Sequence, residues 1–215
     1  HYGISFLAKR SQGTIPLWVL FLAVQLLDVI WAPLVLLGIE KVRIVPGFTA
    51  TNPLDLYYMP YTHSLLAALC WSVAAAATYR VFVRTSSLRA CLFVGGAVFS
   101  HWVLDFVVHR PDLPLFDDSA KVGLGLWNRP ALAFGLEAIL LLGGVVFFLR
   151  FRSGRWVPLI VFSLIMLGIQ AYIFFGPPPV SDVAIASTAL GAYVVFAVGI
   201  WLLTDWRPES RLTSA

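Results

Sequence analysis

The stretch that decides the fold is LRACLFVGGAVFSHWVLDFVVH, residues 88–109. It is mostly apolar and long enough to cross a bilayer core, which takes about 20 residues in a helix. Within it, His101, Asp105 and His109 recur four residues apart, so they share one face of a helix. Ionisable groups are costly in hydrocarbon unless they are paired or bound to something. The stretch therefore predicts a membrane-spanning helix that carries a functional site.

The composition extends this prediction to the whole chain. Hydrophobic residues make up 60% of the 215 residues, charged residues 12%, and the mean hydropathy is +0.85. Soluble domains carry about 25% charged residues. We therefore expect an all-α integral membrane protein. Because no basic stripe with interleaved aromatic residues is present, nucleic acid is not an expected partner.

Hydropathy divides the chain into about six transmembrane helices within one polytopic membrane domain, residues 1–215. The expected spans are 14–38, 63–84, 88–109, 129–150, 157–175 and 183–205. Pro33 lies near the end of the first span and predicts a kink there. The breaks between spans are rich in Gly, Pro, Ser and Asn, which is typical of turns.

The distribution of Lys and Arg predicts the orientation, because cytoplasmic loops carry the excess of positive charge. One side of the expected bundle holds Lys9, Arg10, Arg80, Arg84, Arg89, Arg150, Arg152, Arg155, Arg207 and Arg211. The other side holds Lys41, Arg43, Arg110, Lys121 and Arg129. This ten-to-five division places both termini in the cytoplasm, and the long loops 39–62 and 110–128 outside.

The ionisable residues inside the spans fall at similar depths. At 1.5 Å per residue, Asp28, His101 and Glu137 lie roughly 12–15 Å below the outer surface. Asp105 lies nearer to that surface, and His63 opens the second span at its outer mouth. Imidazole and carboxylate groups are good ligands for Zn²⁺ or a similar ion. Their convergence predicts a metal site in the outer half of the bundle.

Two residues near this depth have other interpretations. His109 is followed by Arg110 and Pro111, so we expect a surface residue or a supporting group rather than a ligand. Glu137 has no Lys or Arg within a helical turn. It could form a hydrogen bond across helices to Ser or Gln, or it could transfer protons at the site.

The order of these residues resembles that of a known family. Asp28 lies in "LLDVIW", "THSLLAAL" spans residues 62–69, "HWVLD" spans residues 101–105, and His1 precedes them all. This pattern, over roughly the first half of the chain, is similar to that of the bacterial membrane-bound metal-dependent hydrolases. The resemblance implies metal ligation by His63, His101 and Asp105, with Asp28 joining them, in a multi-pass protein of the bacterial inner membrane.

The chain departs from the family pattern in two places. A lone Asp28 stands for the acidic run of the family, and "MPY" at residues 59–61 replaces the "HRG" that precedes its "THS". One or two metal ions remain open alternatives. His1 is a further candidate ligand. On the expected topology residues 1–10 lie on the cytoplasmic side, unless they form a half-helix whose His1 end reaches into the bundle.

These expectations combine into one functional hypothesis, an integral-membrane metal-dependent hydrolase. Its divalent metal, Zn first and Fe or Mn as alternatives, would lower the pKa of a bound water towards neutrality. Glu137 is the first candidate for general acid–base catalysis, and Asp28 is the second. Trp127 and Asn128 are expected to form a substrate lip. Membrane lipids are the expected partners, and the substrate would be an amphipathic or lipid-like ester or phosphoester at the outer half of the bilayer.

Three alternatives remain from the sequence. The first is an ion-coupled transporter that uses Asp28, Asp105 and Glu137 as a relay. The second is a metal-dependent lipid-modifying enzyme that is not a hydrolase, and the third is a structural protein whose polar residues lock helices together. Spans without an internal repeat, with polar groups in one half only, argue against a transport path.

Overall fold

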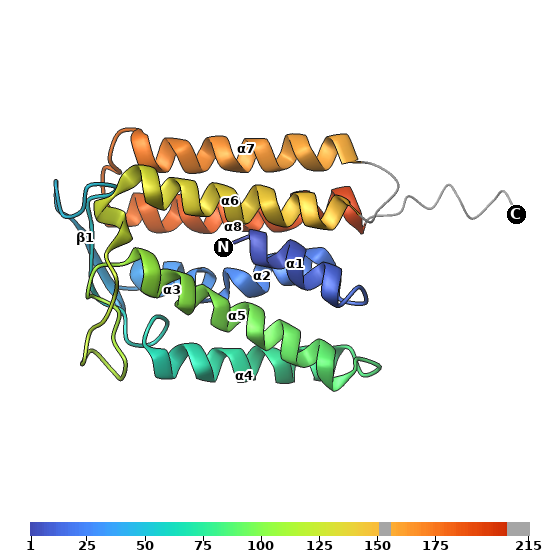
Figure 1. Cartoon of the computed structure of the whole chain (residues 1–215). Coiled ribbons are helices and arrows are strands. Elements are labelled where there is room, and N and C mark those ends of the chain that lie inside the picture. The colour runs from blue at the N-terminus through green and yellow to red at the C-terminus, as the bar shows by residue number, and fades with distance from the viewer. Residues whose placement is uncertain (151–155, 206–215) are drawn as a thin grey trace, which may run out of the picture.

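The computed structural model describes residues 1–150 and 156–205. These residues are mostly helical, and the long helices run side by side with loops and strands gathered at one end (Figure 1). The elements are α1 (Gly3–Ser11), α2 (Leu17–Val24), α3 (Leu26–Leu36), β1 (Lys41–Ile44), β2 (Leu54–Tyr58), α4 (Leu65–Phe82), α5 (Leu88–Val108), the 3₁₀-helix η1 (Leu126–Asn128), α6 (Pro130–Leu149), α7 (Trp156–Phe175) and α8 (Asp182–Thr204).

The helices have the length and surface of membrane spans. Five of the described helices, α4 to α8, are long and apolar enough to cross a bilayer, and the α2–α3 pair adds a sixth if it counts as one span. Large apolar side chains such as Leu92, Val146 and Val195 are exposed on the outside of the bundle. The chain is therefore a multi-pass membrane protein, and five of the predicted spans agree with the helices to within two residues.

The first predicted span is interrupted at a different place from the one expected. Pro33, the site of the expected kink, is a helical residue of α3, which continues to Leu36. The interruption lies instead at Gln25, where α2 and α3 meet at 53°. The carbonyl of Val24 at this break accepts a hydrogen bond from the ring of His101, 2.7 Å away. In a continuous helix that carbonyl accepts from the backbone N–H four residues later.

Helix α1 is a half-helix that begins inside the bundle, as the second of the two alternatives for residues 1–10 predicts. The N-terminal end lies midway along the length of the long helices (Figure 1). Gly3 and Gly144 let α1 and α6 approach closely, since a Cβ on either glycine would overlap the other segment's backbone. At the far end of α1, Lys9 donates to the carbonyls of Gly13 and Ile15.

The loop end of the bundle is more ordered than the sequence predicts. Strands β1 and β2 form an antiparallel pair in the loop expected outside, residues 39–62. In the second long loop, the backbones of Leu113 and Val122 bond to each other. A small apolar core lies beneath these loops, with Trp31, Met59 and Leu113 buried in it. This layer covers the end of the bundle nearest to the ionisable residues.

Candidate metal centre

Five ionisable side chains from four segments meet inside the bundle. His101 and Asp105 come from α5, Asp28 from α3, His63 from the residues before α4, and His1 from the residues before α1. They form two triads, His1–His101–Asp105 and Asp28–His63–His101. Within each triad the potential ligand atoms lie within 4.8 Å of one another. Both triads are groups that could hold a metal ion.

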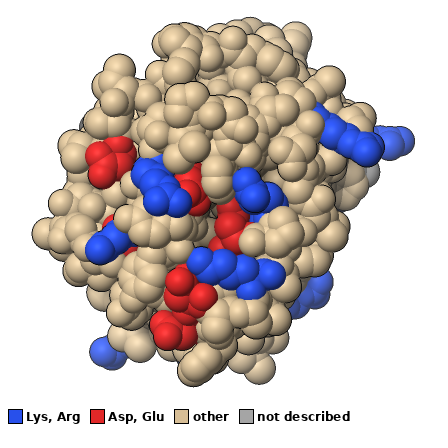
Figure 2. Space-filling view, turned by 90° about the vertical axis from the view of Figure 1, so that its left-hand side faces the viewer, with Lys and Arg blue, Asp and Glu red and all other residues tan. Residues whose placement is uncertain are grey.

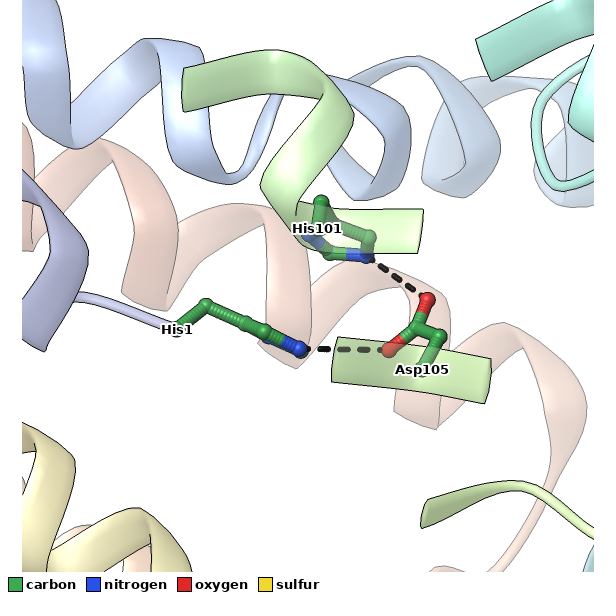
Figure 3. A group of neighbouring side chains, drawn as sticks. All are labelled: His1, His101 and Asp105. Carbon is green, nitrogen blue, oxygen red and sulfur yellow. Dashed lines mark ion pairs between the residues drawn. The ribbon is translucent and has the colours of Figure 1, made fainter. Parts of the chain in front are cut away.

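The donor atoms of the cluster face one another. Figure 3 shows Asp105 between two imidazoles, with Oδ1 3.2 Å from His1 Nε2 and Oδ2 3.0 Å from His101 Nε2. His63 Nε2 lies 3.2 Å from Asp28 Oδ1 and 3.6 Å from Asp105 Oδ2. His101, Asp105 and His63 are at most 4% exposed. The predicted ligands are thus brought together, and these three are shielded from solvent, whereas His1 and Asp28 are partly exposed.

Local structure explains why these side chains point inward. The spacing of His101 and Asp105 places both on one face of α5, as predicted. Before α4, Ser64 caps the helix by accepting from the N–H of Ala67. The carbonyl of His63 accepts from the indole N–H of Trp102 on α5 at 2.9 Å. The "THS" segment is therefore fixed to α5 next to the cluster.

The hydrogen bond at the other side of the His101 ring defines its tautomer. A backbone carbonyl only accepts, so Nδ1 of His101 must carry a hydrogen to donate to Val24. In the neutral ring, Nε2 then has a lone pair that faces the Asp105 carboxylate. While this ring is neutral, the buried Asp105 Oδ2 has no hydrogen-bond donor among the described residues, although its distance to Nε2 is 3.0 Å. Two facing lone pairs repel, and either a proton on Nε2 or a metal cation between the two groups removes the repulsion. Nitrogen and carboxylate donors of this kind suit Zn²⁺.

Asp28 is held in place by residues that the sequence did not single out. Its Oδ2 accepts from the hydroxyl of Tyr193 at 2.7 Å and from the amide of Gln25 at 3.2 Å. Its Oδ1 is left facing His63 and His101. Tyr193 on α8 thus reaches this cluster from the last span, beyond the half of the chain that the family pattern covers.

Glu137 on α6 lies outside both triads. Its carboxylate accepts a hydrogen bond from Gln170 on α7 at 2.5 Å. The interhelical bond that the sequence offered as one alternative is therefore present. Gly3 packs against the backbone of Leu140, one turn along α6 from Glu137, and this contact puts the start of α1 at the level of Glu137. The role of Glu137 in proton transfer stays a prediction.

His109 is not a surface residue, and that expectation is wrong. It is 3% exposed, its Nδ1 lies 2.9 Å from Asp112, and its ring packs on Trp127 with centroids 4.2 Å apart. Burial disfavours the charged ring, but the bond to Asp112 and the Asp105 carboxylate hold the pKa of His109 above its ordinary value. His109 belongs to neither triad. It supports the loop rather than the cluster, as its second interpretation predicts.

The expected substrate lip lies beside His109. The carbonyl of Trp127 accepts from the hydroxyl of Thr51, and this bond joins the two long loops. Asn128 is exposed at the end of η1. Gly125 has φ +72°, a conformation that favours glycine, and its N–H donates to the carbonyl of His109. Trp127 and Asn128 are thus fixed to the end of α5.

Glu40 and Thr62 are not among the site residues that the sequence predicts. Glu40 follows α3 and is 1% exposed, and it contacts the "THS" segment through Thr62. Burial raises the pKa of Glu40, against the effect of the hydrogen bonds that it accepts. A lone acidic residue in a loop carries no periodic signal. Thr62 had a signal, since it precedes His63 in the motif, but only the structure shows its partner.

The loop end also collects charged side chains. Figure 2 looks onto this end and shows Lys and Arg side chains interleaved with Asp and Glu near its centre. Two of these contacts are ion pairs, Arg43 with Asp55 at 2.6 Å and Lys121 with Asp118 at 2.7 Å. The polar surface is therefore at the same end as the buried cluster.

Comparison with protein-family models, with curated proteins and with solved structures finds no match to this chain.

Proposed function

We propose that this protein is an integral-membrane metal-dependent hydrolase of the bacterial inner membrane, with its centre in the outer half of the bilayer. The observation that carries the proposal is the Asp105 carboxylate. It is buried between His1 and His101, close to His63 and Asp28, and while these rings are neutral its Oδ2 has no hydrogen-bond donor among the described residues. A divalent cation would supply the missing positive charge.

Zn²⁺ is the first choice of ion, because imidazole nitrogen and carboxylate oxygen are its common ligands together with thiolate. His63, His101, Asp105 and Asp28 would hold it, with His1 as a further ligand. The two triads share His101, whose Nε2 has a single lone pair. That nitrogen therefore serves one ion at a time. When bound, the metal supplies a water whose pKa is lowered towards neutrality.

The residues of the chain itself would then move the proton. Glu137 is the proposed general base or acid, since it is a carboxylate outside both triads and at the level of the start of α1. Its bond from Gln170 would hold the carboxylate in one orientation. Asp28, whose Oδ2 is held by Tyr193 and Gln25, is the second candidate for this role.

The proposed substrate is an amphipathic or lipid-like ester or phosphoester. Two features support this class. The cluster lies among helices with apolar outer surfaces, which suits a molecule that partitions into the bilayer. The charged loop end and the Trp127–Asn128 lip lie at the same end of the bundle, where a polar headgroup would be held.

The test is metal analysis of the purified protein and of three variants, together with hydrolysis of ester and phosphoester lipids. Protein purified without chelator should contain stoichiometric metal. His101→Ala and Asp105→Ala should each lose it, because both remove donors that face the cluster. His109→Ala is the matched control, since His109 is equally buried on the same helix end but belongs to neither triad. It should keep most of the metal.

Three outcomes contradict parts of the proposal. Wild-type protein without stoichiometric metal would refute the metal centre and would leave the ion-coupled transporter, with protons on the imidazoles. Metal that is bound with no hydrolysis of any ester or phosphoester lipid would refute the hydrolase, and would favour a lipid-modifying enzyme of another class. Equal loss of metal in all three variants would refute the assignment of ligands.

A further inference from the structure

Glu40 is a buried carboxylate whose partners all come from one short segment. Its Oε1 accepts from the backbone N–H groups of Tyr61 at 2.8 Å and Thr62 at 3.0 Å, and its Oε2 accepts from the Thr62 hydroxyl at 2.6 Å. Among the described residues no Lys or Arg forms an ion pair with it. Buried carboxylates without a cation are expensive, so these hydrogen bonds must stabilise the charge.

The hydroxyl of Thr62 connects this carboxylate to the candidate metal centre. Its oxygen lies 2.6 Å from Glu40 Oε2 and 2.7 Å from His63 Nδ1. All three groups are buried, with Thr62 fully shielded. On the other side of the His63 ring, Nε2 faces Asp28 and Asp105. Glu40, Thr62 and His63 therefore form a chain of hydrogen bonds that ends at the cluster.

The chemistry of Glu40 determines which group donates in each of these hydrogen bonds. Three hydrogen bonds donated to Glu40 favour its ionised form over the neutral form that burial favours. An ionised carboxylate only accepts hydrogen bonds, so the single hydroxyl hydrogen of Thr62 then points to Glu40. The hydroxyl oxygen then has only lone pairs to offer, and His63 Nδ1 must be the donor. In the neutral ring, Nε2 is left without a hydrogen, with its lone pair directed at Asp28 Oδ1.

We propose that Glu40, acting through Thr62, holds His63 in the Nδ1–H tautomer and thereby makes Nε2 a metal ligand. Glu40 is a positioning residue, since it contacts neither His63 nor the centre directly. Carboxylates that orient ligating histidines in this way strengthen metal binding, and their loss costs about 10–100-fold in affinity. The consequence for affinity rests on the proposed metal centre, whereas the tautomer rests on the hydrogen bonds alone.

Glu40→Gln tests the direction of the chain. The two backbone N–H groups at Oε1 would keep the amide oxygen on their side, so the amide NH₂ would face Thr62. Its hydroxyl would then accept from the amide and donate to His63 Nδ1. The tautomer of His63 should therefore reverse, with the hydrogen on Nε2. The backbone N–H groups of Tyr61 and Thr62 keep an acceptor in the amide oxygen of the glutamine, so the protein should stay folded.

Two measurements read this out. The first is the ¹⁵N spectrum of histidine-labelled, metal-free protein, titrated upward in pH until the rings are neutral and assigned with His63→Asn. Wild-type His63 should show a protonated Nδ1 and a bare Nε2, and Glu40→Gln should show the reverse. His101, held by the Val24 carbonyl, should be unchanged and serves as the internal reference. The second is zinc affinity by chelator competition, which Glu40→Gln should weaken by about 10–100-fold.

Substitutions at Thr62 complete the test. Thr62→Val removes the hydroxyl and should weaken zinc binding, whereas Thr62→Ser should restore both the tautomer and the affinity. Thr204→Val, at the far end of α8, is the control for loss of a threonine hydroxyl. Wild-type tautomer and affinity in Glu40→Gln or Thr62→Val would overturn the inference. If wild-type protein binds no zinc but shows the predicted tautomer reversal, the positioning chain stands and the metal centre fails.

Discussion

The two histidines at the centre of the cluster are oriented by different kinds of partner. His101 donates to a backbone carbonyl, that of Val24, whereas His63 donates to the hydroxyl of Thr62. No side-chain substitution removes a carbonyl, but a single substitution removes a hydroxyl. The orientation of His63 is therefore the one that point mutation can change without altering the backbone.

Glu137→Gln should keep the fold and the bound metal but lose most turnover. The amide still reaches Gln170 on α7, but it cannot take up a proton. General acid–base groups contribute about 10²–10⁴-fold to rate, so a loss of that size is expected in kcat. The measurement is turnover of a lipid ester or phosphoester at saturating substrate, with metal content determined in parallel.

The control for Glu137 is its partner. Gln170→Leu breaks the same interhelical hydrogen bond and leaves the carboxylate in place. It should retain much more activity than Glu137→Gln. Equal losses in the two variants would assign Glu137 to helix packing alone, and loss of metal in Glu137→Gln would make it a ligand and leave Asp28 as the better base candidate.

For individual residues, the sequence predicts the candidate ligands better than it predicts the residues that hold them in place by hydrogen bonds. His101 and Asp105 are recognisable because polar residues at helical spacing are conspicuous in an apolar run. Asp28 shares the estimated depth of His101, and His63 stands in the "THS" motif at the outer mouth of the next span. Glu40, Thr62 and Tyr193 could not be found in the same way, because a loop carboxylate, a threonine beside a motif and a tyrosine in a span are each common without any such role.

Among the elements, the contact between α1 and α6 depends on two glycines. A Cβ on Gly144 would overlap the backbone of Gly3, whereas a Cβ on the neighbouring Gly143 would meet no atom within 4 Å. Small residues at such crossings let helix backbones approach closely in membranes. Because neither glycine has a side chain, the start of α1, with His1, can pack directly against the backbone of α6.

Gly144→Ala should therefore destabilise the protein by about 1–3 kcal/mol, the usual cost of inserting a methyl group into a packed contact. It should also weaken metal binding if His1 is a ligand, because α1 must move. Unfolding in detergent by a chemical denaturant measures the first effect. Gly143→Ala should leave stability within about 0.5 kcal/mol of the wild type, as is usual for exposed substitutions. Equal effects at both positions would contradict the packing argument.

The elements also show where reading a sequence for helix breakers fails. Proline draws attention to Pro33, which lies within α3 and does not interrupt it. The chain bends at Gln25, a residue with no intrinsic tendency to end a helix. A tertiary contact accompanies the break, since the Val24 carbonyl there accepts from the ring of His101 on α5. Local propensity could not predict a break that serves partners far along the sequence.

For the whole molecule, the predicted orientation has both termini in the cytoplasm and residues 110–128 outside. The Lys and Arg residues expected outside lie in the loops around β1, β2 and η1, at the end opposite the α4–α5 connection (Figure 1). Arg152, Arg155, Arg207 and Arg211, which add to the cytoplasmic count, lie outside the described residues. The excess of positive charge in cytoplasmic loops sets the expected direction.

Cysteine labelling tests this orientation. In a Cys70→Ser background, a membrane-impermeant maleimide added to intact cells should label Ser119→Cys but not Thr85→Cys. Both positions are exposed, and they lie in loops at opposite ends of the bundle. Permeabilised cells, in which both cysteines should react, are the control. Labelling of Thr85→Cys alone in intact cells would reverse the orientation and leave the cluster in the inner half of the bilayer.

The break between α2 and α3 links the shape of the bundle to the state of its centre. The Val24 carbonyl is free to hold His101 only because the two helices do not continue into each other. Coupling of this kind is reciprocal. Whatever fixes the imidazole also stabilises the 53° bend, and whatever straightens the helix pair releases the imidazole. We therefore expect the thickness of the surrounding bilayer, which acts on helix tilt, to act on the orientation of His101 as well.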